Sequence, residues 1–298
     1  MRILVTGREG QVVRALVKLV SSRPELVVLP VGRPNFDLTS SVSPLPLFEG
    51  YRPDLIVNAA AYTAVDQAEN EPEVAHAANS RGAGLVAAAA ASINVPVIQI
   101  STDYVFAGDG EYPYRETDPV GPAGVYGASK LAGERAVAEA NPNHAILRTA
   151  WVYAAEGKNF VRTMLRLAKS RDEVGVVADQ FGNPTSATDI AEGIIKVALN
   201  LLRKPEDPAL RGTFHMTAAG ETSWAGFAEA IFMEAERRGG PSARVRPIAT
   251  SDYPTPARRP ANSRLNCRKL YQAHGVALPP WQDGLARCIE TISMSGDW

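Results

Sequence analysis

The sequence predicts an α/β protein, a Rossmann-like doubly wound parallel sheet with a smaller mixed α/β lobe. Short apolar segments at residues 3–6, 26–31, 54–59, 95–100 and 145–149 alternate with helical patterns through the first half of the chain. Several of these segments are apolar on both faces, which is typical of parallel strands covered by helices. After Trp151 the alternation becomes irregular, and this change indicates the second lobe.

Apolar spacing and end signals place the helices. One helix follows the first strand, and others are expected at 73–91 and 126–140, the latter ending at Asn141-Pro142. In the second half the pattern predicts helices at 158–170, 189–202, 223–238 and 266–274 and a strand at 212–217. We expect Thr222 or Ser223 to cap the third of these helices and Gly275 to end the fourth.

The composition excludes several classes of function. The 298 residues carry a net charge of −1, so no bulk field attracts nucleic acid or an anionic membrane. The two cysteines, Cys267 and Cys288, are too far apart for a metal-binding or redox pair, which fits a reduced cytoplasmic location. The chain runs directly into its first strand without a signal-peptide pattern. The Ala-rich residues 84–93 are too few to span a bilayer and predict a buried helix.

A glycine-bearing turn at residues 6–12 lies between the first strand and the first helix. Glycines at this place, here Gly7 and Gly10, let the backbone approach a pyrophosphate, and the helix N-terminus supplies N–H groups. The motif is Gly-x-x-Gly, because Val13 stands where a third glycine is usual. Taken alone, it is compatible with an ordinary strand–helix turn. Its position after the first strand favours a dinucleotide site.

A phenol and an ammonium lie one turn apart on one helix face in the segment Tyr126-Gly127-Ala128-Ser129-Lys130. The ammonium stabilises the phenolate, so the pair can give a proton to a carbonyl oxygen while hydride reaches the carbon. Thr102 ends a predicted strand, at the edge where such sheets bind ligands, and can hydrogen-bond the same carbonyl. An isolated Tyr-x-x-x-Lys is usually a solvated helix surface. Its combination with the glycine turn and Thr102 favours a reductase.

The residues after the second strand predict the cofactor. In this fold they face the adenosine ribose, and sites that prefer NAD place a carboxylate there. No acid stands at Val31, Gly32 or Arg33. The Arg33 guanidinium is instead suited to a 2′-phosphate. We therefore expect NADPH to be preferred, with NADH as an alternative cofactor.

Four motifs follow one another along the chain: TDYVF at 102–106, YGASKLAGE at 126–134, RTAWVY at 148–153 and DQFGNPT at 179–185. A fifth, RPANSRL, lies at 259–265. Together they resemble the dTDP-4-dehydrorhamnose reductase family of the extended short-chain dehydrogenase/reductase superfamily, over residues 1–285. The resemblance implies reduction of the C4 keto group of dTDP-4-dehydro-6-deoxy-L-mannose to dTDP-L-rhamnose.

The resemblance also implies roles for individual residues. Tyr126 is the proton donor, Lys130 lowers its pKa and holds the nicotinamide ribose, and Thr102 orients the keto oxygen. Asp103 and Trp151 contact the sugar. The other implied cofactor contacts are Gly10, Gln11 and Val12 at the pyrophosphate, Asp37 and Leu38 at the adenine, and Ala60, Ala61 and Tyr62 after the third strand.

These assignments divide the chain into two lobes. Residues 1–149 and 187–218 form the predicted dinucleotide-binding lobe, and residues 150–186 and 219–298 the smaller substrate-binding lobe. The first helix departs from the family pattern at Val13, which is expected to displace the helix slightly from the sheet. It departs again at Ala15, where the family often has a glutamate of a magnesium site at its dimer interface. We therefore expect no metal site, while a homodimer stays open.

Two other functions stay open from the sequence. One is a nucleotide-sugar epimerase or dehydratase of the same fold, which would recycle a tightly held cofactor. The other is a non-enzymatic NADP-binding regulatory subunit, against which intact Thr102, Tyr126 and Lys130 argue. The four scattered histidines are interpreted as structural, and the acidic residues 66–73 as a solvated loop and helix start. Asn79 is either a proton relay or a capping or core amide.

Overall fold

A six-stranded sheet forms the centre of the larger lobe in the computed structural model, which describes residues 1–298. The strands lie in the order β10-β5-β4-β3-β1-β2, and all neighbours are parallel. Their bounds are β1 Arg2–Thr6, β2 Val27–Val31, β3 Leu55–Asn58, β4 Val97–Thr102, β5 His144–Thr149 and β10 Gly212–His215. The order reverses between β1 and β3, so ligands are expected at the carboxyl ends of these strands.

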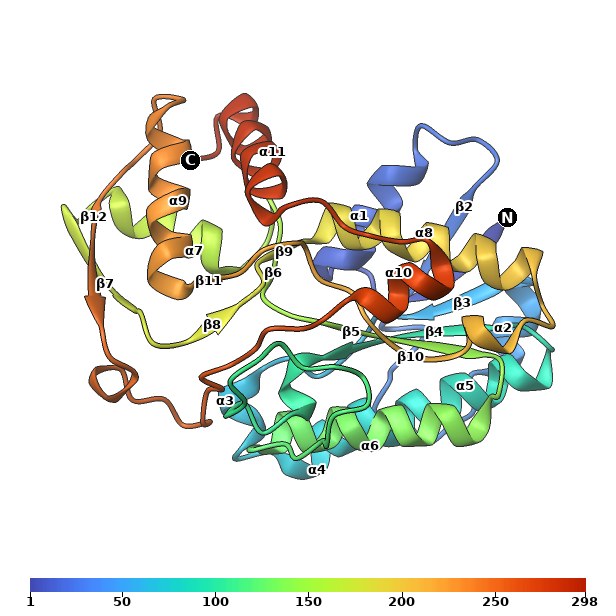
Figure 1. Ribbon diagram of the computed structural model, residues 1–298. Coiled ribbons are helices and arrows are strands. Elements are labelled where there is room, and N and C mark those ends of the chain that lie inside the picture. The colour runs from blue at the N-terminus through green and yellow to red at the C-terminus, as the bar shows by residue number, and fades with distance from the viewer.

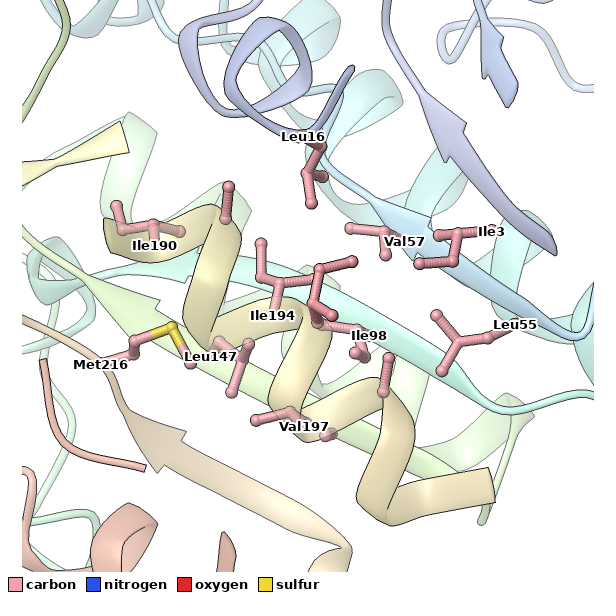
Figure 2. Close-up of a cluster of buried hydrophobic side chains, with 14 of the residues drawn as sticks. Ile3, Leu16, Leu55, Val57, Ile98, Leu147, Ile190, Ile194, Val197 and Met216 are labelled. Carbon is pink, nitrogen blue, oxygen red and sulfur yellow. The ribbon is translucent and has the colours of Figure 1, made fainter. Parts of the chain in front are cut away.

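Helices cover both faces of this sheet, as the consecutive apolar residues of the strands require. Ile3 and Val5 face one core and Leu4 faces the other, and all three are fully buried. Figure 2 shows Ile190 and Ile194 of the helix above the sheet near Leu147. The first face carries α1 Gln11–Val20 and α8 Ala187–Arg203, and the second carries α2 Leu45–Tyr51, α5 Ala83–Ser92 and α6 Val125–Ala140.

The helix expected at 73–91 is divided in the structure. It consists of α4 Pro72–His76, a π-helical turn Ala77–Gly82 and α5, preceded by the short α3 Val65–Ala68. Two glycines allow very close packing here. A Cβ on Gly82 would lie 2.0 Å from the Leu38 carbonyl oxygen, and one on Gly133 of α6 would lie 1.9 Å from that of Asn79. The π turn therefore lies directly against the helix that carries Tyr126 and Lys130.

The smaller lobe packs three helices over short strand pairs. These are α7 Phe160–Ala168, α9 Trp224–Glu236 and α11 Trp281–Ser295, which Figure 1 shows beside the sheet. The strands are β6 Val152–Tyr153 with β9 Thr185–Ser186, β7 Glu173–Val177 with β12 Arg244–Ile248, and β8 Phe181–Gly182 with β11 Thr222–Ser223. A separate core holds this lobe together, with Tyr153, Phe227 and Trp281 as its largest side chains.

The predicted fold class is confirmed, and the structure differs in its details. The predicted caps are present: Ser223 accepts a hydrogen bond from the Gly226 amide, and Gly275 ends α10 Arg268–His274 in the left-handed region. The sequence did not predict α2, α11 or the two-residue strands, nor the single 3₁₀ turns Asp103–Val105, Pro208–Leu210 and Thr250–Asp252. No helix is both long enough and apolar enough to cross a membrane.

The division into lobes remains a prediction, and one segment lies across it. Leu270, Val276 and Leu278 fall in the range expected to form the smaller lobe. In the structure they pack in the core of the larger lobe, against α8 and β10. The chain thus returns to the sheet before α11 completes the smaller lobe (Figure 1).

Candidate active site

Buried polar side chains join the carboxyl ends of β1, β3 and β4. The Thr6 hydroxyl accepts from the Ala60 amide at 3.0 Å and donates to Asn58 Oδ1 at 2.6 Å. Asn58 Nδ2 donates to Gln99 Oε1 at 2.7 Å, and Gln99 Nε2 donates to the Ile100 carbonyl at 2.8 Å. Since each buried polar group has a partner, the network holds the strand ends rigidly.

Helix α6 carries Tyr126 and Lys130 into this edge of the sheet. Its N-cap residue, Gly124, has no capping side chain, and the Val125 amide donates instead to Glu69 Oε1 at 2.9 Å. A Cβ on Gly127 would lie 2.1 Å from the Tyr104 carbonyl oxygen, so glycine is required for the helix to approach. These contacts place Tyr126 close enough to Thr102 and Asp103 for both to influence the pKa of its phenol. The structure therefore unites the predicted triad at one place.

The Tyr126 phenol is protonated at neutral pH. Burial and the nearby Asp103 carboxylate raise its pKa, although the hydrogen bond with Thr102 opposes the rise. We expected Lys130 to lower the pKa of Tyr126, but in the protein alone this pKa is raised. The effect of burying the phenol is larger than the other effects on it. A protonated phenol is the state that a proton donor requires.

Lys130 is buried and positioned by the sheet. Its Nζ donates to the Ile100 carbonyl at 2.7 Å, the same oxygen that Gln99 reaches. Burial lowers the pKa of the ammonium to about 8, while the charge of Glu134 opposes the fall. The ammonium is thus held at the point where the polar network meets the helix.

Asp103 follows Thr102 and is buried beside it. The Thr102 hydroxyl donates to Asp103 Oδ1 at 3.0 Å. Burial raises the pKa of this carboxyl to about 6, although hydrogen bonds from Ser263 and Thr102 lower it. An acid with a raised pKa next to Tyr126 is typical of a functional site, because a structural role alone does not require the cost of burying it.

The glycine turn has free donors for an anion. Gly7 lies at φ 98°, in the region that favours glycine, and Gly10 precedes α1 without a capping side chain. The amides of Gln11, Val12 and Val13 therefore have no intrahelical partner, and the helix dipole adds positive potential. Val13 is buried and fits there, since a Cβ on Gly7 would lie 3.3 Å from its methyl group. These residues fit a dinucleotide pyrophosphate.

Two arginines lie at the end of β2. Arg33 is exposed, and its charge contributes to the lowered pKa of Asp37, after the hydrogen bonds from Thr39. Arg8, in the glycine turn, lies against Gly32, where a Cβ would lie 3.0 Å from its Cγ. Leu38 is buried nearby. Sequence reasoning missed Arg8, although a basic residue inside the turn was a signal available to it.

Asn79 connects the loop after β3 to helix α6 by hydrogen bonds. The Tyr62 amide donates to Asn79 Oδ1 at 2.8 Å, and Asn79 Nδ2 donates to the Tyr62 carbonyl and to Ser129 Oγ, both at 3.0 Å. Of the two roles left open for Asn79, these contacts match the core amide. They also fix residues 60–62, the expected cofactor contacts, against α6.

Trp151 forms the wall of the site that faces the smaller lobe. Its backbone has φ 48°, which is strained for a large side chain. The indole stacks on Trp224 with ring centroids 3.5 Å apart and planes at 8°. A Cβ on Gly182 would lie 2.5 Å from the same ring. Trp224 also packs against the core of the smaller lobe, so it joins that core to the residue expected to contact the sugar.

A cavity of about 430 Å³ lies beside this site. Arg258, Arg259 and Thr250 line it, with Asp179 and Tyr253. Arg259 lies close enough to Tyr104 to oppose the rise in the Tyr104 pKa, and the Tyr104 ring packs edge-on against Tyr126 at 5.5 Å between centroids. Arg259 Nη2 donates to Asp66 Oδ2 at 2.5 Å. The cavity therefore adjoins the Tyr126 site through Tyr104, and its two arginines are accompanied by the carboxylates of Asp109 and Asp179.

Known proteins share this chain's sequence and fold. A sequence model of the family described as the RmlD substrate binding domain matches residues 1–294. A dTDP-4-dehydrorhamnose reductase of Sinorhizobium fredii is 49% identical over 99% of each chain, and one of Escherichia coli is 43% identical over 98% of each. The chain belongs to the dTDP-4-dehydrorhamnose reductase family. This confirms the resemblance and the expected class of oxidoreductase.

Solved structures agree with the family. The dTDP-4-dehydrorhamnose reductase of Clostridium acetobutylicum superposes with a TM-score of 0.90 at 38% identity, covering 99% of this chain and 100% of that one. The Bacillus anthracis reductase, solved in complex with NADP, gives 0.89 at 36% identity, covering 97% and 99%. The two-lobed fold is therefore that of this family.

The acidic residues 66–73 correct one expectation within this family fold. We expected a solvated loop, but three of the carboxylates are partly buried and bonded. Asp66 pairs with Arg259, Glu69 accepts from the start of α6, and Glu71 accepts from the Tyr62 hydroxyl at 2.8 Å. A local charge pattern shows no long-range partners, so the sequence contains no signal of these bonds. The expected helix start is present, since Glu73 lies in the first turn of α4.

The buried histidines have structural contacts. His215 Nδ1 lies 3.1 Å from the Tyr114 carbonyl oxygen, and burial lowers the pKa of its imidazole to about 3, helped by the Arg148 charge. Burial also lowers the pKa of His274 to about 4. Both imidazoles are thus neutral at physiological pH, as packing residues in a core require.

Proposed function

We propose that the chain reduces the C4 keto group of dTDP-4-dehydro-6-deoxy-L-mannose to give dTDP-L-rhamnose, with Tyr126 as the proton donor. The observation that carries the proposal is the meeting of Thr102, Tyr126 and Lys130 at the carboxyl edge of the sheet. The free amides of α1 lie at the same edge, so a cofactor and a carbonyl are brought together there.

Each residue of the triad has one task in this reaction. NADPH supplies the hydride when it is bound. The Thr102 hydroxyl, which donates to Asp103 Oδ1 in the protein alone, would turn its hydrogen to the keto oxygen and orient it. The Tyr126 phenol donates its proton to that oxygen as the C4–H bond forms. The Lys130 ammonium then stabilises the phenolate that remains, and it also holds the cofactor ribose.

The cofactor contacts follow from the free donors and charges of the first lobe. The amides of Gln11 and Val12 bind the pyrophosphate, with Gly7 and Gly10 leaving room for it. Arg8 and Arg33 supply positive charge at the end of β2, which favours a 2′-phosphate and hence NADPH. The reductase of Bacillus anthracis, whose structure includes NADP, supports this choice of cofactor.

The substrate lies between the triad and the smaller lobe. Asp103 and Trp151 contact the sugar from opposite elements. Arg258 and Arg259 line the adjacent cavity. Arg259 is paired with Asp66, whereas the exposed Arg258 guanidinium has no ion-pair partner and matches the charge of a nucleotide diphosphate. A cytoplasmic location and a homodimer remain predictions that accompany this proposal.

The test is turnover with an external cofactor. Purified protein is incubated with NADPH and dTDP-4-dehydro-6-deoxy-L-mannose, loss of NADPH is followed by absorbance, and the product is identified by NMR. We expect stoichiometric NADPH oxidation and dTDP-L-rhamnose. Release of an isomerised or dehydrated sugar without NADPH consumption would instead indicate the epimerase or dehydratase alternative, and no turnover would favour the regulatory subunit.

A further inference from the structure

We infer that Glu134 and Arg148 form a positioning ion pair that sets the charge of Lys130 and the placement of Tyr126 and Lys130. The inference rests on the proposed function, because it concerns the same proton transfer. Glu134 closes the YGASKLAGE motif and Arg148 opens the RTAWVY motif. Neither residue contacts the proposed substrate, and the reaction described above leaves both unused.

The two side chains form a bidentate ion pair that is buried in the protein. Arg148 Nε donates to Glu134 Oε1 at 2.9 Å, and its Nη2 donates to Oε2 at 2.7 Å. Both side chains are only 5% exposed. The Ser101 hydroxyl donates to Oε1 at 2.6 Å. One carboxylate on α6 is thus bonded to both β4 and β5.

Three successive residues of β4 each lie against one side chain of α6. The Ile100 carbonyl accepts from Lys130, the Ser101 hydroxyl donates to Glu134, and Thr102 lies close enough to the Tyr126 phenol to lower its pKa. The three α6 side chains are spaced four residues apart and so share one helix face. Glu134 is therefore the third side chain of α6 that lies against β4, beside the two that are proposed to be catalytic.

The ion pair also sets the charge behind Lys130. Glu134 is the charged group whose field acts on the Lys130 ammonium, and Arg148 neutralises it from β5. Asp103, in the 3₁₀ turn after β4, acts on Tyr126. Losing one partner of the pair would leave a single unbalanced charge in a buried region, where charges act strongly.

The other groups around α6 have different partners. Glu69, between α3 and α4, caps α6, and Arg81 of the π turn donates to the Thr39 carbonyl. His215 of β10 is neutral because burial and the Arg148 charge lower its pKa. A buried ion pair is seldom more stabilising than apolar side chains of equal volume. A stabilising role alone would therefore not require these two residues.

The deciding variant is Glu134→Gln, which keeps the shape of the side chain and removes its charge. The reduction requires protonated Tyr126 and charged Lys130, so its rate falls as either group loses its proton at high pH. Removing the negative charge of Glu134 weakens proton binding at Lys130, the group on which its field acts. We therefore expect the fall in kcat at high pH, the alkaline limb of its pH profile, to occur about one pH unit lower than in the wild type. The fall in NADPH affinity at high pH should shift by the same amount.

The double variant Glu134→Gln/Arg148→Met separates charge from placement. It removes both charges, so we expect the alkaline limb to return to its wild-type position while kcat stays lowered, because the contact with β4 and β5 is lost. Glu173→Gln is the matched control, since this carboxylate pairs with Arg246 on the outer β7–β12 strands. It should leave the profile unchanged. Circular dichroism establishes that each variant is folded.

A folded Glu134→Gln variant with an unshifted limb would overturn the inference and reduce the pair to a structural role. Should that variant not fold, Ser101→Ala removes one donor and leaves both charges. It should lower kcat about three- to tenfold with KM for NADPH unchanged, and an unchanged kcat would equally overturn the inference. Absence of turnover in the wild type would refute the proposed function instead, and the pH profile of NADPH affinity would still test the pair.

Discussion

The two walls of the active-site cleft are built on different principles. On the sheet side, Thr6, Asn58 and Gln99 bond one another in a buried chain that ends at the oxygen bound by Lys130. On the side of the smaller lobe, a stacked pair of indoles and two cavity arginines face the cleft. The groups that are proposed to transfer the proton are therefore held by hydrogen bonds within the protein, before any ligand binds. The substrate wall keeps its aromatic surface and the Arg258 charge for the ligand, while Arg259 is already paired with Asp66.

Replacing Lys130 breaks the sheet-side wall most severely. Lys130→Met removes both the charge that stabilises the phenolate and a contact with the cofactor ribose. We expect kcat to fall about 10²–10³-fold and NADPH affinity to weaken as well. Steady-state kinetics and fluorescence titration measure the two effects. Lys196→Met, on the exposed face of α8, is the control, and an unchanged affinity in Lys130→Met would exclude its cofactor role.

Replacing Arg33 tests the cofactor end of the same wall. We expect the wild type to prefer NADPH over NADH by about ten- to hundredfold in kcat/KM, since a charge-assisted hydrogen bond contributes roughly 1.5–3 kcal/mol. Arg33→Ala should remove most of the preference by raising KM for NADPH, and Arg8→Ala should remove a further part. Kinetics with both cofactors decide this, with Arg171→Ala as an exposed control. Equal use of NADH by the wild type would contradict the assignment.

Asp103 tests whether the sheet-side wall is maintained at a cost in stability. Its pKa is raised to about 6 from an ordinary 3.8, so the folded state binds the proton more tightly. Stability therefore falls as pH rises from about 4 to 6, and the full penalty, on the order of 3 kcal/mol, is present above pH 6. Asp103→Asn should raise Tm by several degrees at pH 7.5 and match the wild type near pH 4, while lowering activity.

Thermal unfolding of Asp103→Asn across this pH range makes the comparison. Asp172→Asn, on the exposed end of β7, serves as the matched control and should show no such pH-dependent gain. A Tm gain for Asp103→Asn that is equal at pH 4 and pH 7.5 would show that the charge is not its cause.

Removal of metal ions by a chelator is expected to have the smallest effect of these tests. Ala15 of α1 packs against the first core, and it stands where a metal-binding glutamate occurs in the family pattern. We expect EDTA to leave both turnover and the gel-filtration profile unchanged. Loss of activity or of an oligomer on chelation, restored by magnesium, would contradict this expectation.

The same two walls differ in how far the sequence could predict them. Local patterns predict the sheet, the glycine turn and the Tyr126–Lys130 spacing, because strand–helix alternation and helical periodicity are short-range signals. The bond between Glu134 and Arg148 joins two motifs that the sequence identifies, but nothing local shows that they meet. Trp224 and Arg259 act on the site through contacts across long stretches of chain. Their roles depend on packing, which composition and spacing do not encode.

The rise in the Tyr126 pKa has the same origin. Sequence spacing places an ammonium near the phenol and so predicts a lowered pKa. It carries no measure of burial, which dominates in the folded protein. A partner can be predicted from sequence more readily than the local dielectric, so the direction of a pKa shift is the less secure part of such a prediction.

The most direct test of the account is the Tyr126→Phe variant, which removes one hydroxyl and keeps the ring. Tyr126 lies close to Thr102 but is only one of many proposed cofactor contacts. We predict that single-turnover reduction of the keto sugar slows by about 10²–10⁴-fold, while the Kd for NADPH stays near that of the wild type. Full activity in this variant would contradict the assignment of Tyr126 as the proton donor, and with it the proposed mechanism.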